Sequence, residues 1–122
     1  MKKILIQDKS ANDAHLDTIR DLTRLRLNND FEIETTYCLS KTKFDITQYN
    51  LIISHPNVYG DCCIPYILKA KEKNIPIIFT YKMDEPEQKL QFISDKFNIE
   101  LRHRNLGSRI YSDLIKSLEG KF

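Results

Sequence analysis

The sequence has little of several residue types from which particular kinds of site are built. It has no tryptophan, and its only three glycines are Gly60, Gly107 and Gly120. Glycines this far apart cannot form the glycine-rich loops of P-loop or dinucleotide-binding sites. The cysteines are equally few, Cys38, Cys62 and Cys63, and show neither a C-x-x-C pair nor a cysteine–histidine spacing typical of zinc. We therefore expect no metal centre and no bound cofactor.

Long hydrophobic runs are also missing. None approaches the roughly 20 residues of a membrane-spanning helix. Met1 to Ile6 begins like a signal peptide, but the apolar run stops at Gln7-Asp8, short of the roughly 7–15 residues that such a region needs. These absences predict a cytoplasmic protein with no membrane contact, whose cysteines stay reduced.

Charge of one sign is scarce too. Lysine and arginine number 19 against 17 acidic residues, a net charge of +2, which is too small to indicate nucleic-acid binding. The 122 residues are 41% hydrophobic and 30% charged, a balance typical of a globular protein. Because no linker, repeat or low-complexity stretch divides the chain, we expect one domain spanning residues 1–122.

Hydrophobic patterning predicts five strands: Lys2–Asp8, Phe31–Leu39, Asn50–Ser54, Ile75–Tyr81 and Ile99–His103. The third and fourth are continuous apolar runs, as in strands that are buried on both faces of a parallel sheet. The second alternates with a period of two, which favours a place near the sheet edge.

Helical spacing predicts four helices: residues 11–28, 61–74, 85–98 and 108–118. In the first, Ile19, Leu22 and Leu25 contribute to the apolar stripe, and either Ser10 or Asn12 could cap the start. Pro65 and Pro86 fall in the first turns of the next two helices, where proline is tolerated. The segment from Ser40 to Tyr49 is long enough only for a turn.

Strands that alternate with helices indicate βαβ units and a parallel sheet. The expected fold is a flavodoxin-like three-layer α/β/α sandwich with five parallel strands in the order 2-1-3-4-5 and a shortened or missing second helix. In this order the first and third strands are neighbours at the switch point, where α/β proteins bind ligands. Asp8 and His55 would then lie side by side at the carboxyl edge of the sheet.

Three stretches resemble the first, third and fourth strands of the receiver domains of bacterial response regulators (CheY-like): K-K-I-L-I-Q-D, Y-N-L-I-I-S-H-P and K-E-K-N-I-P-I-I-F-T-Y. The order of the elements resembles a receiver along nearly the whole chain. The resemblance implies the fold just described and a role in signal transduction, as in two-component systems.

In receivers an aspartate at the end of the third strand takes the phosphoryl group, two acids after the first strand hold Mg²⁺, and a hydroxyl and a lysine end the fourth and fifth strands. The equivalent positions in this chain are Asp8, Lys9, His55, Thr80 (with Tyr81 as the alternative register) and Arg104. One carboxylate beside a lysine and a histidine is a poor Mg²⁺ site. The resemblance therefore implies a degenerate pseudo-receiver that is not phosphorylated on aspartate and has no catalytic residues.

Basic residues gather at the same predicted rim. A possible anion site comprises Lys82, Gly107, Ser108 and Arg109, because backbone N–H groups at a helix start favour anions. The alternative is a solvated rim with scattered salt bridges. His55 could likewise be a phosphohistidine or a general base, or simply a loop histidine that packs or contacts a partner. Tyr49, Tyr59 and Tyr81 could serve an interface or pack locally.

Two functions from different classes follow. The first is a non-enzymatic receiver-like module that binds another signalling protein or itself, as a homodimer through the last two helices and the last strand, residues 85–118. Its partner contacts would involve the exposed residues Glu87, Lys89, Arg102 and Arg109. The alternative is a small enzyme or ligand-binding domain that uses the rim for a phosphorylated small molecule. The first predicts a filled rim, and the second predicts a cavity there. The chain could also be the N-terminal domain of a longer regulator.

Overall fold

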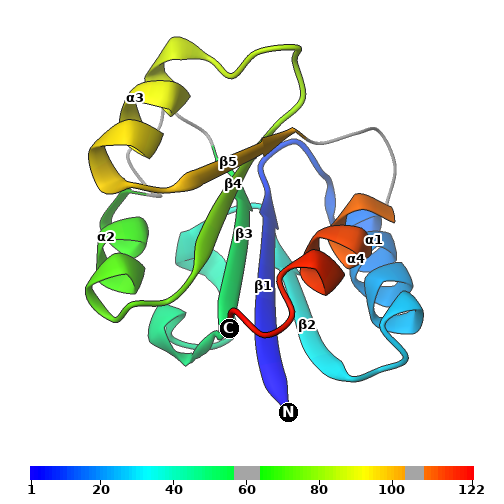
Figure 1. Ribbon diagram of the computed structural model, residues 1–122. Helices are drawn as coiled ribbons and strands as arrows, with labels where there is room; N and C mark the ends of the chain where they lie inside the picture. Colours follow the sequence, from blue (N-terminus) through cyan, green and yellow to red (C-terminus); the bar gives the residue numbers. More distant parts are fainter. Residues whose placement is uncertain (57–63, 104–108) are drawn as a thin grey trace.

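The computed structural model describes residues 1–56, 64–103 and 109–122, and contains the predicted parallel sheet. Its strands follow the order β2-β1-β3-β4-β5 (Figure 1). They are β1 (Lys2–Asp8), β2 (Phe31–Thr36), β3 (Leu51–His55), β4 (Ile77–Tyr81) and β5 (Glu100–His103). The predicted strand order is confirmed, and β3 lies at the centre of the sheet.

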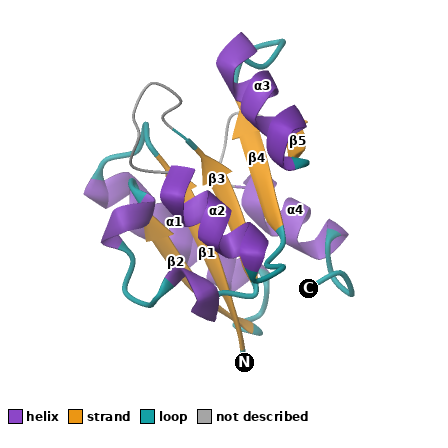
Figure 2. Ribbon diagram, turned by 90° about the vertical axis from the view of Figure 1, so that its left-hand side faces the viewer, coloured by secondary structure: helices purple, strands orange, loops and turns teal. Residues whose placement is uncertain are grey.

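Helices cover both faces of this sheet, so the fold has three layers (Figures 1 and 2). One face is covered by α2 (Ile64–Glu72) and α3 (Gln88–Phe97), and the other by α1 (Asp13–Arg26) and α4 (Arg109–Ser117). Side chains along a strand alternate between these two cores, so Ile52 packs towards α2 and α3 while Ile53 packs towards α1 and α4. This double burial explains the unbroken apolar run in β3. No helix in the described ranges is long and apolar enough to cross a membrane.

A helix between β2 and β3 is replaced by two short 3₁₀ turns, η1 (Leu39–Lys41) and η2 (Ile46–Gln48). Leu39, Ile46 and Tyr49 from this segment are buried and fill the space against the sheet. Asp45 begins η2, because its Oδ1 accepts hydrogen bonds from the backbone N–H of Thr47 at 2.9 Å and from the Thr47 hydroxyl at 2.7 Å. The predicted loss of the second helix is confirmed.

Several element boundaries differ from those predicted. Strand β2 ends at Thr36 instead of Leu39, because the Thr36 hydroxyl donates to the carbonyl of Cys38 and turns the chain. Helix α3 begins only at Gln88, so Pro86 precedes the helix instead of lying in its first turn. Of the two candidate caps for α1, Asn12 is the residue whose side chain accepts from the N–H of His15, at 2.8 Å.

The buried face of α1 also differs from the prediction. Leu25 is 66% exposed, whereas Leu16, Ile19 and Thr23 are buried. These three residues follow the helical spacing of three to four. Because Thr23 is polar, the hydrophobic pattern of the sequence does not identify it as part of the buried face. Leu25 is therefore an exposed apolar residue on the α1 side of the molecule.

Candidate functional site

Three buried polar side chains meet where β1, β3 and β4 end. Asp8 pairs with His55 in the register of β1 and β3, and Ser54 pairs with Phe79 in that of β3 and β4, which places His55 beside Thr80. The exposed fractions of Asp8, His55 and Thr80 are 0%, 8% and 1%. Polar groups buried this deeply need hydrogen-bond partners, so their contacts define what the site can do.

The Asp8 carboxylate is bound to the loop that follows it. Its Oδ1 accepts hydrogen bonds from the N–H of Ser10 at 3.0 Å and from the Ser10 hydroxyl at 2.7 Å. Its Oδ2 lies 3.4 Å from the hydroxyl of Tyr111, which comes from α4. Asp8 therefore ties together β1, the following loop and the last helix.

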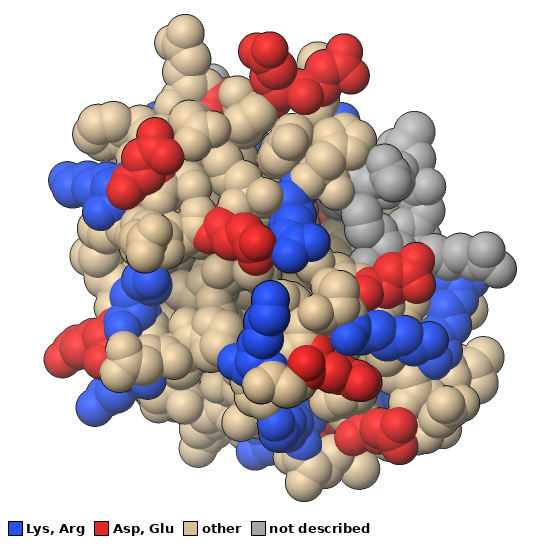
Figure 3. Space-filling model, in the orientation of Figure 1, with Lys and Arg blue, Asp and Glu red and all other residues tan. Residues whose placement is uncertain are grey.

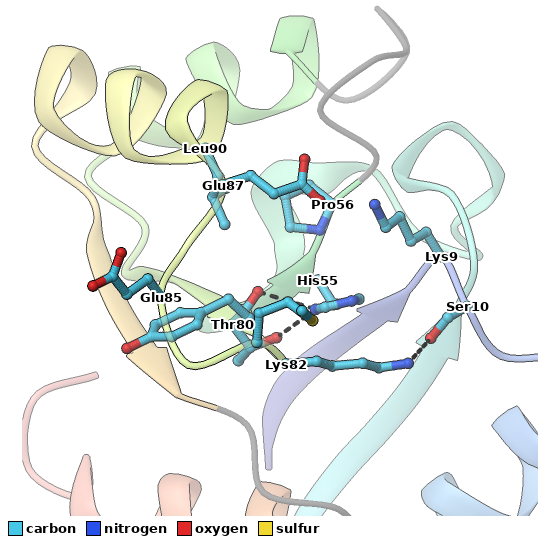
Figure 4. Close-up of a pocket in the computed structure, with 11 residues that line it drawn as sticks. Lys9, Ser10, His55, Pro56, Thr80, Lys82, Glu85, Glu87 and Leu90 are labelled. Atoms are coloured by element: carbon cyan, nitrogen blue, oxygen red, sulfur yellow. Dashed lines mark hydrogen bonds between the residues drawn. The ribbon is translucent and has the colours of Figure 1, made fainter.

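His55 is oriented by the neighbouring strand. Its Nδ1 lies 3.0 Å from the carbonyl oxygen of Thr80 and 3.4 Å from the Thr80 hydroxyl (Figure 4). Since a carbonyl only accepts, the hydrogen bond to the Thr80 carbonyl requires a proton on Nδ1. The structure thus places Thr80, and not Tyr81, beside His55. Tyr81 instead lies edge-on to the ring of His103, with ring centroids 5.3 Å apart.

A lysine bridges the loops after β1 and β4. The ammonium of Lys82 donates to the Ser10 hydroxyl at 2.7 Å, and that hydroxyl in turn donates to Asp8. Lys9 follows Asp8, and its backbone N–H lies 3.3 Å from the carbonyl of His55. Figure 4 shows the Lys9 side chain at the same rim, so both lysines lie near the ends of β1 and β4.

A cavity of about 270 Å³ opens at this rim (Figure 4). Lys9, Ser10, His55, Thr80 and Lys82 contribute polar groups to its lining. The rest of the lining combines apolar and acidic side chains: Pro56 after β3, Tyr81 at the end of β4, Met83, Glu85 and Glu87 before α3, and Leu90 on α3. The first functional hypothesis predicted a filled rim, so the cavity favours the alternative on this point.

Gln7 belongs to the site and was not among the predicted residues. It is 1% exposed, its Nε2 donates to the carbonyl of Tyr37 at 3.0 Å, and its Oε1 accepts from the Ser54 hydroxyl. The sequence offered one indication of this role: Gln7 is a polar residue within an otherwise apolar strand, directly before Asp8. The last two residues of β1 are thus Gln7 and Asp8, while Lys9 is exposed beyond the strand.

Some predicted site residues lie outside the described part of the chain. Arg104, Gly107 and Ser108 are not described, and neither are Tyr59, Cys62 and Cys63. Arg109 begins α4, but its side chain is not described. Of the possible anion-binding set, Lys82 is placed at the cavity. Tyr49 is buried and packs edge-on to Phe44, away from the carboxyl rim.

The residues at the site do not suit Mg²⁺. This ion needs several oxygen ligands in octahedral geometry, usually with one or two carboxylates. Asp8 offers one carboxylate, already bonded to Ser10 and Tyr111, with the Lys82 ammonium one hydroxyl away. Within the described ranges, no three His, Cys, Asp or Glu side chains converge as metal ligands do.

The surface seen in Figure 3 mixes acidic and basic side chains instead of gathering one sign. Such a mixture gives no large single-sign field for a polyanion. On β5, Arg102 contacts Glu100 at 3.1 Å.

Comparisons with known proteins identify the architecture. No protein-family profile matches the chain, and no curated protein matches it by sequence. Among solved structures, a CheY-like response regulator receiver domain protein from Methanospirillum hungatei JF-1 superposes with a TM-score of 0.65 at 18% identity, covering 99% of this chain and 93% of the other. The non-phosphorylated HemR receiver domain from Leptospira biflexa gives 0.63 at 11% identity, covering 97% and 94%. The chain therefore has the fold of response-regulator receiver domains.

Proposed function

We propose that this protein is a non-enzymatic signalling or regulatory module that acts by binding another protein and is not phosphorylated on aspartate. The receiver fold supports a signalling role. The observation that carries the rest is the side chain at the tip of β3: His55 stands there in place of a carboxylate, with its Nδ1 hydrogen-bonded to Thr80. We therefore place the protein among degenerate pseudo-receivers.

The carboxylate nearest to that tip is a poor substitute for the missing acceptor. Asp8 has no exposed surface, and both of its oxygens lie against hydroxyl donors from Ser10 and Tyr111. Attack on phosphorus would require these bonds to break and a divalent cation to enter beside Lys82. The neutral pair of Gln7 and Ser54 supplies no second acid.

Partner binding is assigned to the surface of α3, β5 and α4. Phe92 on α3 is 64% exposed, and Lys96 lies over its ring with the ammonium 6.0 Å from the centroid. A large exposed aromatic side chain rimmed by polar groups is typical of protein interfaces. Glu87 and Lys89 are exposed on the same helix or at its start and would set partner preference by charge. The partner is another signalling protein or a second copy of this chain.

Two exposed apolar residues on opposite faces make a matched test. Phe92→Ser on α3 should abolish dimerisation or capture of an identified partner, whereas Leu25→Ser on α1 should leave both unchanged. Association is measured by light scattering after gel filtration and by pull-down with the purified partner. Equal binding by wild type and Phe92→Ser would refute the assignment of this face.

A specific observation favours a second candidate, a small enzyme or ligand-binding domain of this fold that accepts a phosphorylated small molecule. That observation is the rim cavity of about 270 Å³ with two lysines in its lining. Its size lies just below the roughly 300–1,000 Å³ of small-molecule sites. Chemical-shift changes at Lys82 and His55 on titration with phosphate esters test it. Shifts confined to residues far from the rim would contradict it.

A further inference from the structure

The charges of the rim are arranged as a hydrogen-bonded chain. The Lys82 ammonium donates to the Ser10 hydroxyl at 2.7 Å, and the Ser10 hydroxyl donates to Asp8 Oδ1 at 2.7 Å. The N–H of Ser10 adds a second bond to the same oxygen, at 3.0 Å. One hydroxyl thus separates an exposed cation from a buried carboxylate, and holds both in fixed positions.

Two ammonium groups lie at the cavity without a direct carboxylate partner. The lining includes Lys9 and Lys82 together with Glu85 and Glu87, and Lys82 reaches the buried Asp8 only through the Ser10 hydroxyl. Neither lysine forms a salt bridge with a carboxylate anywhere in residues 1–56, 64–103 or 109–122. A site made of carboxylates has to bind a metal ion before it can accept an anion. The group of Asp8, Ser10 and Lys82 already contains a cation, the Lys82 ammonium.

We infer that the rim binds a phosphate monoester without any metal. The Lys82 ammonium supplies the positive charge that a divalent metal ion supplies in metal-dependent phosphate sites. The inference rests on the second candidate function. The phosphate oxygens accept hydrogen bonds from Lys82 and Lys9, with the Ser10 hydroxyl between the ligand and Asp8. Charge-assisted bonds of this kind are about twice as strong as neutral ones.

The apolar part of the lining specifies what is attached to the phosphate. Pro56, Met83 and Leu90 belong to this part. Met83 is 71% exposed in this structure, so an apolar group that covers it removes that surface from water. A phosphate ester of an aromatic or other apolar alcohol therefore fits better than inorganic phosphate.

Two acids near the cavity differ in a way that makes the inference testable. Figure 4 shows the Glu87 side chain reaching over Pro56 towards Lys9, whereas the carboxylate of Glu85 points away from the cavity. Glu87 repels an incoming phosphate, and Glu85 does so less because of its direction. Glu87→Gln should tighten binding, and Glu85→Gln serves as its matched control.

The test is calorimetric titration of the purified chain with phenyl phosphate, once in EDTA and once in excess Mg²⁺, with inorganic phosphate as the second probe. We expect saturable binding of equal strength in both buffers, and weaker binding of inorganic phosphate. Lys82→Met should weaken binding of phenyl phosphate about tenfold or more, and Lys89→Met, which alters an exposed lysine on α3 outside the cavity, should not. Glu87→Gln should strengthen it, and Glu85→Gln should strengthen it less.

The outcomes separate the inference from the function on which it rests. Binding that requires Mg²⁺, or that is unaffected by Lys82→Met, overturns metal-free recognition through Lys82 but leaves a phosphate-ester site at the rim. No binding in either buffer overturns the site and the second candidate function together. Thermal unfolding of Lys82→Met establishes that the variant is folded, as expected for an exposed residue.

Discussion

Gln7 and Ser54 offer a quantitative test of how the end of β1 is built. Both are buried, on neighbouring strands, and the Ser54 hydroxyl donates to the Gln7 side chain while Gln7 donates to the carbonyl of Tyr37. Gln7 and Ser54 therefore form a neutral, hydrogen-bonded pair next to Asp8. Gln7→Met removes the hydrogen-bonding groups while keeping the length of the side chain.

The loss of stability in Gln7→Met depends on which hydrogen-bond partner of Gln7 can bond to water instead. Ser54 has no exposed surface, so water cannot replace Gln7 at its hydroxyl, whereas Tyr37 is 42% exposed and its carbonyl can be hydrated. A buried polar group without a partner costs about 1–3 kcal/mol. We expect Gln7→Met to lower the free energy of unfolding by about 2 kcal/mol and Ser54→Ala by about 1 kcal/mol. In the double variant neither buried partner is orphaned, so the total should be about 2 kcal/mol, a coupling of about 1 kcal/mol.

Urea denaturation followed by circular dichroism measures these differences. With an m-value of roughly 2 kcal/mol/M, Gln7→Met should lower the urea midpoint by about 1 M. Gln88→Met, an exposed glutamine on α3, is the control and should change stability by less than about 0.5 kcal/mol. Strict additivity of the two single variants would refute the proposed pairing.

Two further predictions concern pH. Burial, followed by the hydrogen bond to Glu34, raises the pKa of Tyr49 above the ordinary 10.0. The stability that Tyr49 contributes is therefore present below that pH and lost as the pH rises through the raised value. Ultraviolet titration should show one tyrosine that ionises above pH 10.0 and is absent in Tyr49→Phe. Hydrogen bonds from the Thr47 N–H and hydroxyl, and then from Lys69, lower the pKa of Asp45 below 3.8. The stability that Asp45 contributes is therefore present above that pH and lost as the pH falls through the lowered value. Carboxyl NMR should show Asp45 titrating below 3.8, and an ordinary pKa would contradict the cap.

Much of the fold was predictable because its signals are local and redundant. The apolar runs around Ile53 and Ile78 have no polar alternation, and only a strand covered on both faces tolerates such a run. The short segment between β2 and β3 leaves no length for a helix, which predicted the missing element. Strand order then followed from the right-handed crossovers of parallel βαβ units.

The details that failed depend on side chains whose role is set by tertiary contacts. Thr23 is buried and Leu25 is exposed, against their polarities, because the rotation of α1 on the sheet decides which face is covered. Thr36 ends β2 through a bond to the backbone that any threonine could make or omit. Propensity alone could not position either residue.

The site was predictable in its location but not in its connections. The positions of Asp8 and His55 followed from strand order, and the register places them as neighbours. The bond from Lys82 to Ser10 joins residues 72 positions apart in the sequence, and the cavity depends on how α3 stands off the sheet. Gln7 was not predicted because a single amide in an apolar strand does not by itself indicate a function. Its role follows only from the hydrogen bond with Ser54 on the neighbouring strand.

Whether the chain accepts a phosphoryl group is tested by exposing it to acetyl phosphate and Mg²⁺ and measuring its intact mass. We expect no stoichiometric gain of a phosphoryl group, because Asp8 is buried and hydrogen-bonded and His55 replaces the acceptor carboxylate. A stoichiometric gain that disappears in Asp8→Asn, or an alkali-stable gain that disappears in His55→Gln, would contradict it. Beryllofluoride with Mg²⁺ should likewise leave the NMR spectrum of the rim unchanged.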